Sequence, residues 1–387
     1  MIISKGIAMR IVRSGSELEL THILGASDTC YFSFWKGRVA LYAILKSLGI
    51  EAGDEVILPG FTCVVVPNAI LYLGAKPIYT DINPQTYNIC AETIAPWITP
   101  RTRAIIVQNT FGLSPDLDPI MELTERKGIF VVEDCAHGLG GSYKERPAGT
   151  TAHASFFSTQ WSKPISIGLG GIAYVRDEEL ISKVTEISMK FPAPGKKEEL
   201  VLALQRLLRP LADHPALYYG LVDLYRFLTQ KSGLSVGSSS GSELDTIQMP
   251  EGYLKSMGKM QRRSLRRELA MLEEKVQHRR EVAAHYDAFF SKKGMAVPFQ
   301  PDYAYHSMLR YPVRVPNKDA FLEKAHQLHI PVGDWFLSPL HPIRGDLSQW
   351  GYQRGQCPEA EKACAEVINL FTDHPLSYQQ LSSLFPG

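Results

Sequence analysis

The chain has 387 residues, and 45% of them are hydrophobic, which is enough for one large buried core and a second, smaller one. Its 41 basic and 40 acidic residues give a formal net charge of +1. This balance offers no electrostatic basis for binding nucleic acid or an anionic membrane surface, and neither partner is expected.

The cysteines and the apolar runs indicate a reduced, soluble, cytoplasmic protein. The six cysteines are scattered, without a CxxC pair or the histidine spacing of a zinc site, so we expect neither a disulfide framework nor a metal centre. The apolar run at the N-terminus is too short for a signal peptide. The most apolar later window, residues 200–228, contains five charged residues, so no membrane span is expected.

Strands and helices alternate through the first third of the chain. Apolar spacing predicts strands at 54–58, 76–80, 103–107 and 128–132, and helices at 38–48, 62–72, 91–98 and 117–127. Apolar strands that alternate with helices of this length are typical of parallel βαβ units, whose sheet is covered on both faces. The predicted fold class is therefore α/β, with ligands at the carboxyl ends of the strands.

The rest of the chain is less regular. The predicted elements are strands at 154–157, 171–175 and 309–315, and helices at 177–189, 253–290 (with Gly258 as a weak point), 319–327 and up to Ile368. Residues 192–245 are less regular, although 198–208 has an amphipathic pattern. We interpret this segment as a surface insertion, and a substrate-binding or partner-binding element is the alternative. We place a large domain at 1–250, and the long helix with a small C-terminal α/β domain at 251–387.

One stretch of the sequence suggests a reactive amine. Residues 155–163 read Ser-Phe-Phe-Ser-Thr-Gln-Trp-Ser-Lys, and Lys163 has aromatic or apolar neighbours and no acidic residue nearby. Burial among such neighbours lowers the pKa of a lysine and makes its neutral amine a nucleophile for carbonyl carbon. Taken alone, the pattern also fits an ordinary solvated lysine.

Two polar residues stand at the end of the fourth predicted strand. Asp134 and His137 are three residues apart there, where a site is expected in a sheet of this kind. The alternative is a helix-capping aspartate with an incidental histidine.

A third feature is the start of the first predicted helix. Gly37 opens it after an aromatic run, and the free amides of such a helix start can hold a phosphate. A plain helix start is the alternative.

Together these residues resemble a known family. The chain is similar to the DegT/StrS sugar aminotransferases, which use pyridoxal phosphate on the type I, aspartate-aminotransferase fold, over residues 34–182 and 249–384. The motifs that carry the resemblance, by their order and spacing, are Gly53-Asp-Glu-Val-Ile-Leu-Pro59, Asp81-Ile-Asn-Pro84 before Tyr87-Asn88, Glu133-Asp-Cys-Ala-His137, Phe157-Ser-x4-Lys163 with Gly168-x-Gly-Gly171, and Pro339-Leu-His341 with Pro358-Glu-Ala-Glu361. The resemblance implies a mostly parallel sheet in the large domain and a smaller C-terminal α/β domain.

The resemblance also implies roles around the cofactor ring. Lys163 would form a Schiff base with pyridoxal phosphate and later move protons. Asp134 would pair with the pyridinium nitrogen, so that the ring can act as an electron sink. His137 lies where the family places a His or Gln near the phenolic oxygen. Cys63 stands where the family usually stacks an aromatic residue on the ring, so the stack is lost or comes from elsewhere, His137 being one candidate.

The resemblance assigns the remaining contacts as follows. Ser158 and the backbone amides of Gly37 and Arg38 would bind the cofactor phosphate. Gln160, Trp335 and His341 are candidates for substrate contacts by position, although each also fits a structural role. The family's acidic residue in the glycine loop is Leu169 here, which leaves the substrate contacts on that side open.

The implied reaction is amine transfer from an amino acid, glutamate in most relatives, to a keto-sugar that is linked to a nucleotide. The implied assembly is a homodimer. A different pyridoxal phosphate reaction is one alternative, but dehydratases of the family carry histidine in place of the lysine. A non-catalytic sensory or structural homologue is another. A dinucleotide-binding domain is disfavoured because no GxGxxG follows the first strand.

Overall fold

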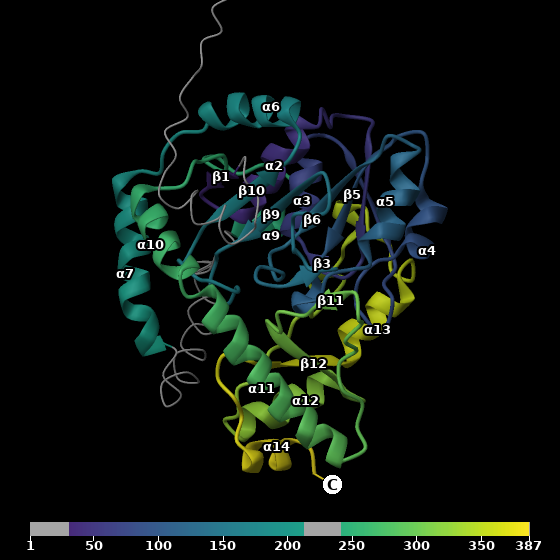
Figure 1. Cartoon of the computed structure of the whole chain (residues 1–387), viewed down its shortest axis with the longest axis vertical. Coiled ribbons are helices and arrows are strands. Elements are labelled where there is room, and N and C mark those ends of the chain that lie inside the picture. Colours follow the sequence, from purple (N-terminus) through teal and green to yellow (C-terminus); the bar gives the residue numbers. More distant parts are fainter. Residues whose placement is uncertain (1–30, 213–240, 387) are drawn as a thin grey trace, which may run out of the picture.

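The computed structural model describes residues 31–212 and 241–386 (Figure 1). The expected insertion at 192–245 therefore lies partly outside the described residues. Its described parts include helix α7 (Lys196–Ala212), which contains the amphipathic segment 198–208, and the short helix α9 (Gly241–Asp245). Among the helices of these two ranges, none combines the length and apolar character that crossing a bilayer requires.

A seven-stranded sheet forms the centre of the molecule. Its strands, from one edge to the other, are β1 (Tyr31–Phe34), β10 (Gly171–Val175), β9 (Ala154–Ser158), β6 (Phe130–Asp134), β5 (Thr102–Gln108), β2 (Glu55–Pro59) and β4 (Lys76–Thr80). The strands from β9 to β4 run parallel, and β10 and β1 add to β9 in antiparallel pairs. The predicted mostly parallel sheet is confirmed.

Helices pack around this sheet, as the alternating pattern predicts. They are α2 (Gly37–Ser47), α3 (Val65–Leu71), α4 (Ala91–Ile94), α5 (Leu117–Glu125) and α6 (Glu178–Met189), with 3₁₀ turns at Ala95–Trp97 and Thr110–Gly112. Helix α2 contacts β9 and β10, and its apolar residues Val39, Leu41 and Ile44 are at most 1% exposed. Strands β7 (Ser142–Tyr143), β8 (Arg146–Pro147) and β11 (Ala304–Tyr305) form a separate sheet, in which β7 is the middle strand.

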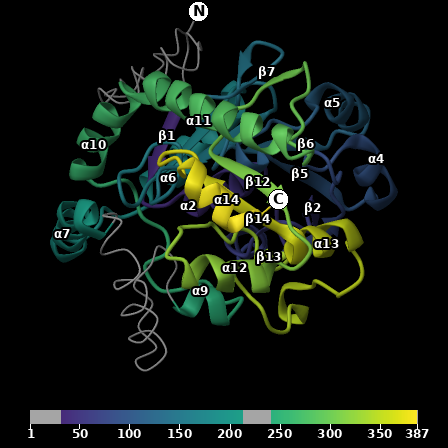
Figure 2. The ribbon, with the colours of Figure 1, turned by 90° about the horizontal axis from the view of Figure 1, so that it is seen from below.

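The C-terminal part has its own apolar cluster, which includes Tyr286, Phe290 and Tyr311. Seen from below in Figure 2, helices surround the antiparallel pair of strands β12 and β14. The elements are α10 (Lys259–Leu269), α11 (Leu272–Lys292), β12 (Arg310–Arg314), α12 (Lys318–Gln327), β13 (Leu340–His341), a 3₁₀ turn at Ser348–Trp350, α13 (Pro358–Glu366), β14 (Val367–Phe371) and α14 (Tyr378–Leu384).

Three predicted elements are wrong in detail. The helix expected over 253–290 begins at Lys259, since the Gly258 amide donates to the side chain of Gln261 at 2.8 Å, and it is broken between α10 and α11. Residues 62–63, expected in a helix, form strand β3 (Thr62–Cys63), which pairs in parallel with β13. The last predicted helix stops at 366, because the following β-branched residues pair with β12.

Candidate active site

The candidate residues gather at the carboxyl ends of two neighbouring parallel strands. Strand β6 ends at Asp134 and strand β9 at Ser158, and Asp134 pairs with Phe156 in the sheet. The loop after β9 carries Lys163, and its turn is closed by a hydrogen bond from the Lys163 amide to the Gln160 carbonyl at 3.2 Å. Parallel strands present their carboxyl ends at one edge, which is why residues distant in sequence meet here.

The amine of Lys163 lies over an indole. Its Nζ is 4.6 Å from the centroid of the Trp335 ring. Burial lowers the pKa of Lys163 from 10.5 to about 8; the neighbouring Cys63 and Asp134 oppose this shift, while the charges of Arg310 and Arg38 favour it. About a tenth of the amine is therefore neutral and nucleophilic at pH 7, far more than for a lysine with the ordinary pKa.

Asp134 is a buried carboxyl, 4% exposed, whose Oδ1 accepts a hydrogen bond from the Ala136 amide at 2.9 Å. Burial raises its pKa to about 6, although this hydrogen bond and the charge of Lys163 act in the opposite direction. A nearby cation or N–H donor would stabilise the ionised form of a carboxylate in such a position.

His137 is buried and neutral. Burial, together with the positive charges of Lys163 and Arg310, holds its pKa well below the usual value. Its Nδ1 accepts a hydrogen bond from the Phe111 amide at 3.3 Å, so the ring proton is on Nε2, which can act as a donor. The imidazole stacks on Trp335, with centroids 4.8 Å apart and planes inclined by 9°.

The start of helix α2 lies close to Ser158. A Cβ built on Gly37 would be 3.0 Å from the Cβ of Ser158, so only glycine allows this approach. No side chain caps the helix at Lys36, and the first amides of a helix lack partners within it. The side chain of Arg38 forms an ion pair with Glu243 at 2.7 Å, and Lys36 pairs with the same carboxylate at 3.0 Å.

Pairing of β3 with β13 brings Cys63 opposite His341. The Nδ1 of His341 accepts a hydrogen bond from the Leu337 amide at 3.2 Å, and burial lowers its pKa to about 4. Gln160, in the loop of Lys163, is partly exposed. The structure thus brings Cys63 close enough to Lys163 to affect its pKa, and places His341 beside Cys63.

Two charged residues of this region were not predicted from the sequence. Arg310, on strand β12, is 4% exposed and lies 5.1 Å from the Trp335 ring centroid. Glu243, on α9, is 1% exposed and joins the start of α2. Neither residue belongs to a recognisable motif. The one signal in the sequence is at Arg310, a charged residue within an otherwise apolar predicted strand.

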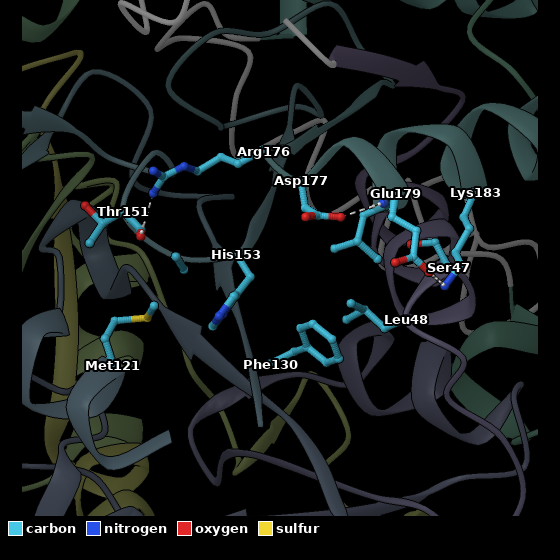
Figure 3. A pocket seen from close by; sticks show the side chains of 12 residues that line it. Ser47, Leu48, Met121, Phe130, Thr151, His153, Arg176, Asp177, Glu179 and Lys183 are labelled. Atoms are coloured by element: carbon cyan, nitrogen blue, oxygen red, sulfur yellow. Dashed lines mark hydrogen bonds and ion pairs between the residues drawn. The ribbon is translucent and has the colours of Figure 1, made fainter. Parts of the chain in front are cut away.

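A separate cavity of about 600 Å³ lies away from these residues (Figure 3). It is lined by His153, Arg176 and Lys183, among others, and contains none of the predicted site residues. Lys183 pairs with Glu179 at 2.7 Å, and Arg176 donates to the carbonyls of residues 150 and 151. Its cations are thus engaged within the protein. In the described part of the chain, no group of three His, Cys, Asp or Glu side chains is arranged to hold a metal ion.

Comparison with known proteins identifies the family. The profile of the DegT/DnrJ/EryC1/StrS aminotransferase family matches residues 22–201 and 229–384. The chain belongs to this family. It is therefore an enzyme, a sugar aminotransferase by class, and its cofactor is pyridoxal 5′-phosphate.

Named relatives and solved structures agree with this assignment. The enzyme is 29% identical over 340 residues to the UDP-2-acetamido-2-deoxy-3-oxo-D-glucuronate aminotransferase of Pseudomonas aeruginosa, covering 86% of this chain and 78% of that protein. It is 36% identical over 169 residues to the L-glutamine:2-deoxy-scyllo-inosose aminotransferase of Streptomyces fradiae, covering 42% and 40%. The crystal structure of a family aminotransferase from Brucella abortus superposes with a TM-score of 0.72 at 22% identity, covering 95% and 87%.

Proposed function

We propose that the enzyme transfers an amino group from an amino acid, with glutamate as the first candidate, to a nucleotide-linked keto-sugar, and that Lys163 binds the aldehyde of the cofactor. The observation that carries this proposal is the environment of Lys163. Burial lowers its pKa to about 8, the buried carboxyl of Asp134 is near enough to affect that pKa, and the Trp335 ring centroid is 4.6 Å from its Nζ. We further propose a cytoplasmic homodimer, as is usual for enzymes of this class.

The residues around Lys163 fit the three polar parts of pyridoxal phosphate. The uncapped start of α2 at Gly37 and Arg38, close to Ser158, offers amides and a hydroxyl to the phosphate. Asp134 offers a carboxylate to the ring nitrogen, and its raised pKa is the mark of a buried acid without sufficient positive charge nearby. When bound, the cofactor supplies an electron sink that stabilises negative charge at the reacting carbon.

Two side chains, Lys163 and His137, have further roles in the proposed reaction. The neutral amine of Lys163 would accept the proton from the α-carbon of the amino donor and donate it again on the product side. His137, protonated on Nε2, donates a hydrogen bond without changing charge, because its pKa is far below neutral.

Substrate contacts are proposed for three further residues. Trp335 offers an aromatic surface of the kind on which a sugar ring packs, and it is partly exposed. His341, which the β3–β13 pairing places opposite Cys63, and Gln160, in the loop that carries Lys163, offer further polar atoms. Cys63, on strand β3, stands where members of the family usually have an aromatic residue. An aromatic residue that stacks on the cofactor ring would therefore have to come from another strand or loop.

The decisive experiment identifies the lysine that carries the cofactor. Purified enzyme loaded with pyridoxal phosphate is reduced with borohydride and digested, and the modified peptide is located by mass spectrometry. We expect the adduct on Lys163, and its loss in Lys163→Ala, with amine transfer reduced by about 10²–10⁴-fold. Lys190→Ala, an exposed lysine paired with Glu186, is the matched control and should behave as the wild type. An adduct on another lysine would overturn the assignment.

The reaction itself is tested in two halves. Glutamate should convert the loaded enzyme to its pyridoxamine form, and a nucleotide keto-sugar should return it to the starting form with release of an amino-sugar detected by mass spectrometry. A stably loaded enzyme that reacts with no amino acid would contradict the proposed reaction.

A further inference from the structure

Helix α7 carries a stripe of apolar side chains that point into solvent. The stripe consists of Leu200, Val201, Leu204, Leu207 and Leu208, which are between 47% and 74% exposed. Their spacing places them on one face of the helix. Within the two described ranges of the chain, no other helix carries more than one exposed large apolar side chain. A contiguous apolar patch of this kind is typical of a surface that contacts a partner.

The opposite face of α7 packs against the rest of the enzyme. Leu202, on this inner face, is only 4% exposed. Arg206 donates a hydrogen bond to the hydroxyl of Ser264 on α10, and Glu198 forms an ion pair with Lys255 at 2.5 Å. The inner face therefore fixes the helix to the enzyme, and the apolar stripe faces away from it.

The exposed charges around the stripe are basic. Lys196 and Lys197 are exposed in the first turn of α7, whereas the two acidic residues of that turn are half-buried. Helix α10, beside α7 in Figure 1, adds the exposed Arg263 and Arg267. The formal net charge of +1 averages over the whole chain and does not describe this surface. Positive charge beside an apolar stripe favours a partner that is both anionic and apolar.

The location of α7 suits an extended, flat partner. Figures 1 and 2 both place this helix at the outer edge of the molecule, so its outer face can lie along a surface. The family profile matches residues 22–201 and 229–384, which leaves Leu204, Leu207 and Leu208 outside the matched ranges. The stripe is therefore an element that the chemistry shared by the family does not require.

We propose that α7 docks the enzyme on a membrane surface that contains anionic phospholipids. The apolar stripe enters the boundary between head groups and acyl chains, and Lys196 and Lys197 contact the head groups. An amphipathic helix with basic residues beside its apolar face binds such a surface through buried apolar area and electrostatic attraction. Each basic residue close to an anionic surface strengthens binding about fivefold. This association is peripheral and requires no spanning helix.

Binding to vesicles tests the role of the stripe. The full chain, loaded with cofactor, is sedimented with vesicles of phosphatidylcholine, with or without phosphatidylglycerol. We expect wild type to bind the mixed vesicles, and the variant that combines Leu204→Gln with Leu207→Gln to bind about tenfold or more weakly. The two leucines are 54% and 74% exposed, so the exchange leaves the core intact.

The matched control combines Leu328→Gln with Val297→Gln, at residues outside α7 that are 44% and 41% exposed. This variant should bind the mixed vesicles as wild type does. The proposal is overturned if wild type does not bind the mixed vesicles, or if the α7 variant binds them equally well.

The charge of the lipid is tested separately. Lys196→Gln combined with Lys197→Gln should weaken binding to the mixed vesicles by about fivefold or more, and added salt should weaken the binding of wild type. Unchanged affinity of the lysine variant would contradict an anionic lipid as the partner.

Light scattering without lipid tests a protein as the occupant of the stripe. A larger assembly that wild type forms and the Leu204 and Leu207 variant does not, together with no binding to vesicles, would assign the stripe to a contact between copies of the chain and overturn the proposal. Amine transfer by these variants in free solution should equal that of wild type, because α7 contains none of the proposed site residues. The vesicle measurement is therefore independent of the proposed function.

Discussion

The imidazole of His137 and the indole of Trp335 lie face to face, with ring centroids 4.8 Å apart and planes inclined by 9°. His137 follows strand β6 of the central sheet, whereas Trp335 precedes strand β13. The Trp335 carbonyl accepts a hydrogen bond from the side chain of Asn369 at 2.8 Å, which ties it to β14. The stack therefore joins the carboxyl edge of the sheet to the C-terminal part of the chain. Because the imidazole of His137 is neutral, its stacking on Trp335 adds no further charge to this buried region.

Removing the indole should loosen this contact. Trp335→Ala deletes the surface on which His137, Lys163 and Arg310 all pack, so we expect the KM for the keto-sugar to rise about tenfold or more. The free energy of unfolding should fall by roughly 1–3 kcal/mol, since the ring is only partly buried. Trp97→Ala, at a residue 40% exposed, is the control for substrate binding and should leave the KM unchanged. Wild-type KM in Trp335→Ala would exclude this ring from the substrate site.

Asp134 should destabilise the cofactor-free protein at neutral pH. Its pKa is raised from 3.8 to about 6, so the folded state holds the proton more tightly than the unfolded state, and stability is lost as pH rises between these values. At pH 8, cofactor-free Asp134→Asn should therefore be more stable than wild type, by on the order of 1–3 kcal/mol. The difference should vanish below about pH 4.

Denaturant titrations of both proteins at pH 4 and pH 8 test this expectation. With cofactor bound the order should reverse, because the amide cannot offer a negative charge to the ring nitrogen. A cofactor-free variant that is less stable than wild type at pH 8 would count against the role of burial in raising this pKa.

Capture of the cofactor should depend on pH through Lys163. The amine has a pKa of about 8, and only its neutral form attacks an aldehyde. The rate should rise about tenfold per pH unit below pH 7 and level off above pH 9. Stopped-flow absorbance after adding pyridoxal phosphate to cofactor-free enzyme measures it. The matched Lys190→Ala protein should give the same profile, and a rate independent of pH between 6 and 9 is incompatible with this pKa.

The ion pairs of the buried Glu243 should contribute more to the free energy of unfolding than ion pairs of solvent-exposed carboxylates. Its carboxylate, on a residue 1% exposed, pairs with both Lys36 and Arg38 at the start of α2. Glu243→Gln removes the shared negative charge from two buried or half-buried cations, so we expect a loss of roughly 3–5 kcal/mol in the free energy of unfolding. Thermal and denaturant unfolding measure it.

The control for this change is Asp118→Asn. Asp118 also bridges two cations, Lys144 and Arg146, but its side chain is 49% exposed. Its loss should cost only about 0–1 kcal/mol, because solvent screens the pair. Equal effects of the two substitutions would show that burial does not decide the strength of the Glu243 pair.

The sequence alone determined the parallel sheet and the strand ends of the site. Apolar runs of four to seven residues separated by helical spacing predict β2, β4, β5, β6 and β9, and these runs end at Asp134 and near Ser158. Such patterns are readable because strand and helix periodicity depend on neighbouring residues. The position of Lys163 in a loop after a strand follows from the same local pattern, as does Gly37 at the start of α2.

Only the tertiary structure decided which side chains surround the amine. Trp335 and Arg310 reach Lys163 from beyond α11, and the pairing of Cys63 with His341 turned a predicted helix start into a strand. Arg38 meets Glu243 across 205 residues of chain. Contacts of this kind arise when separate hydrophobic surfaces pack against each other, and they leave no periodic mark in the sequence. The chemistry of Lys163 was thus visible as a local pattern, but its lowered pKa comes from burial by distant residues.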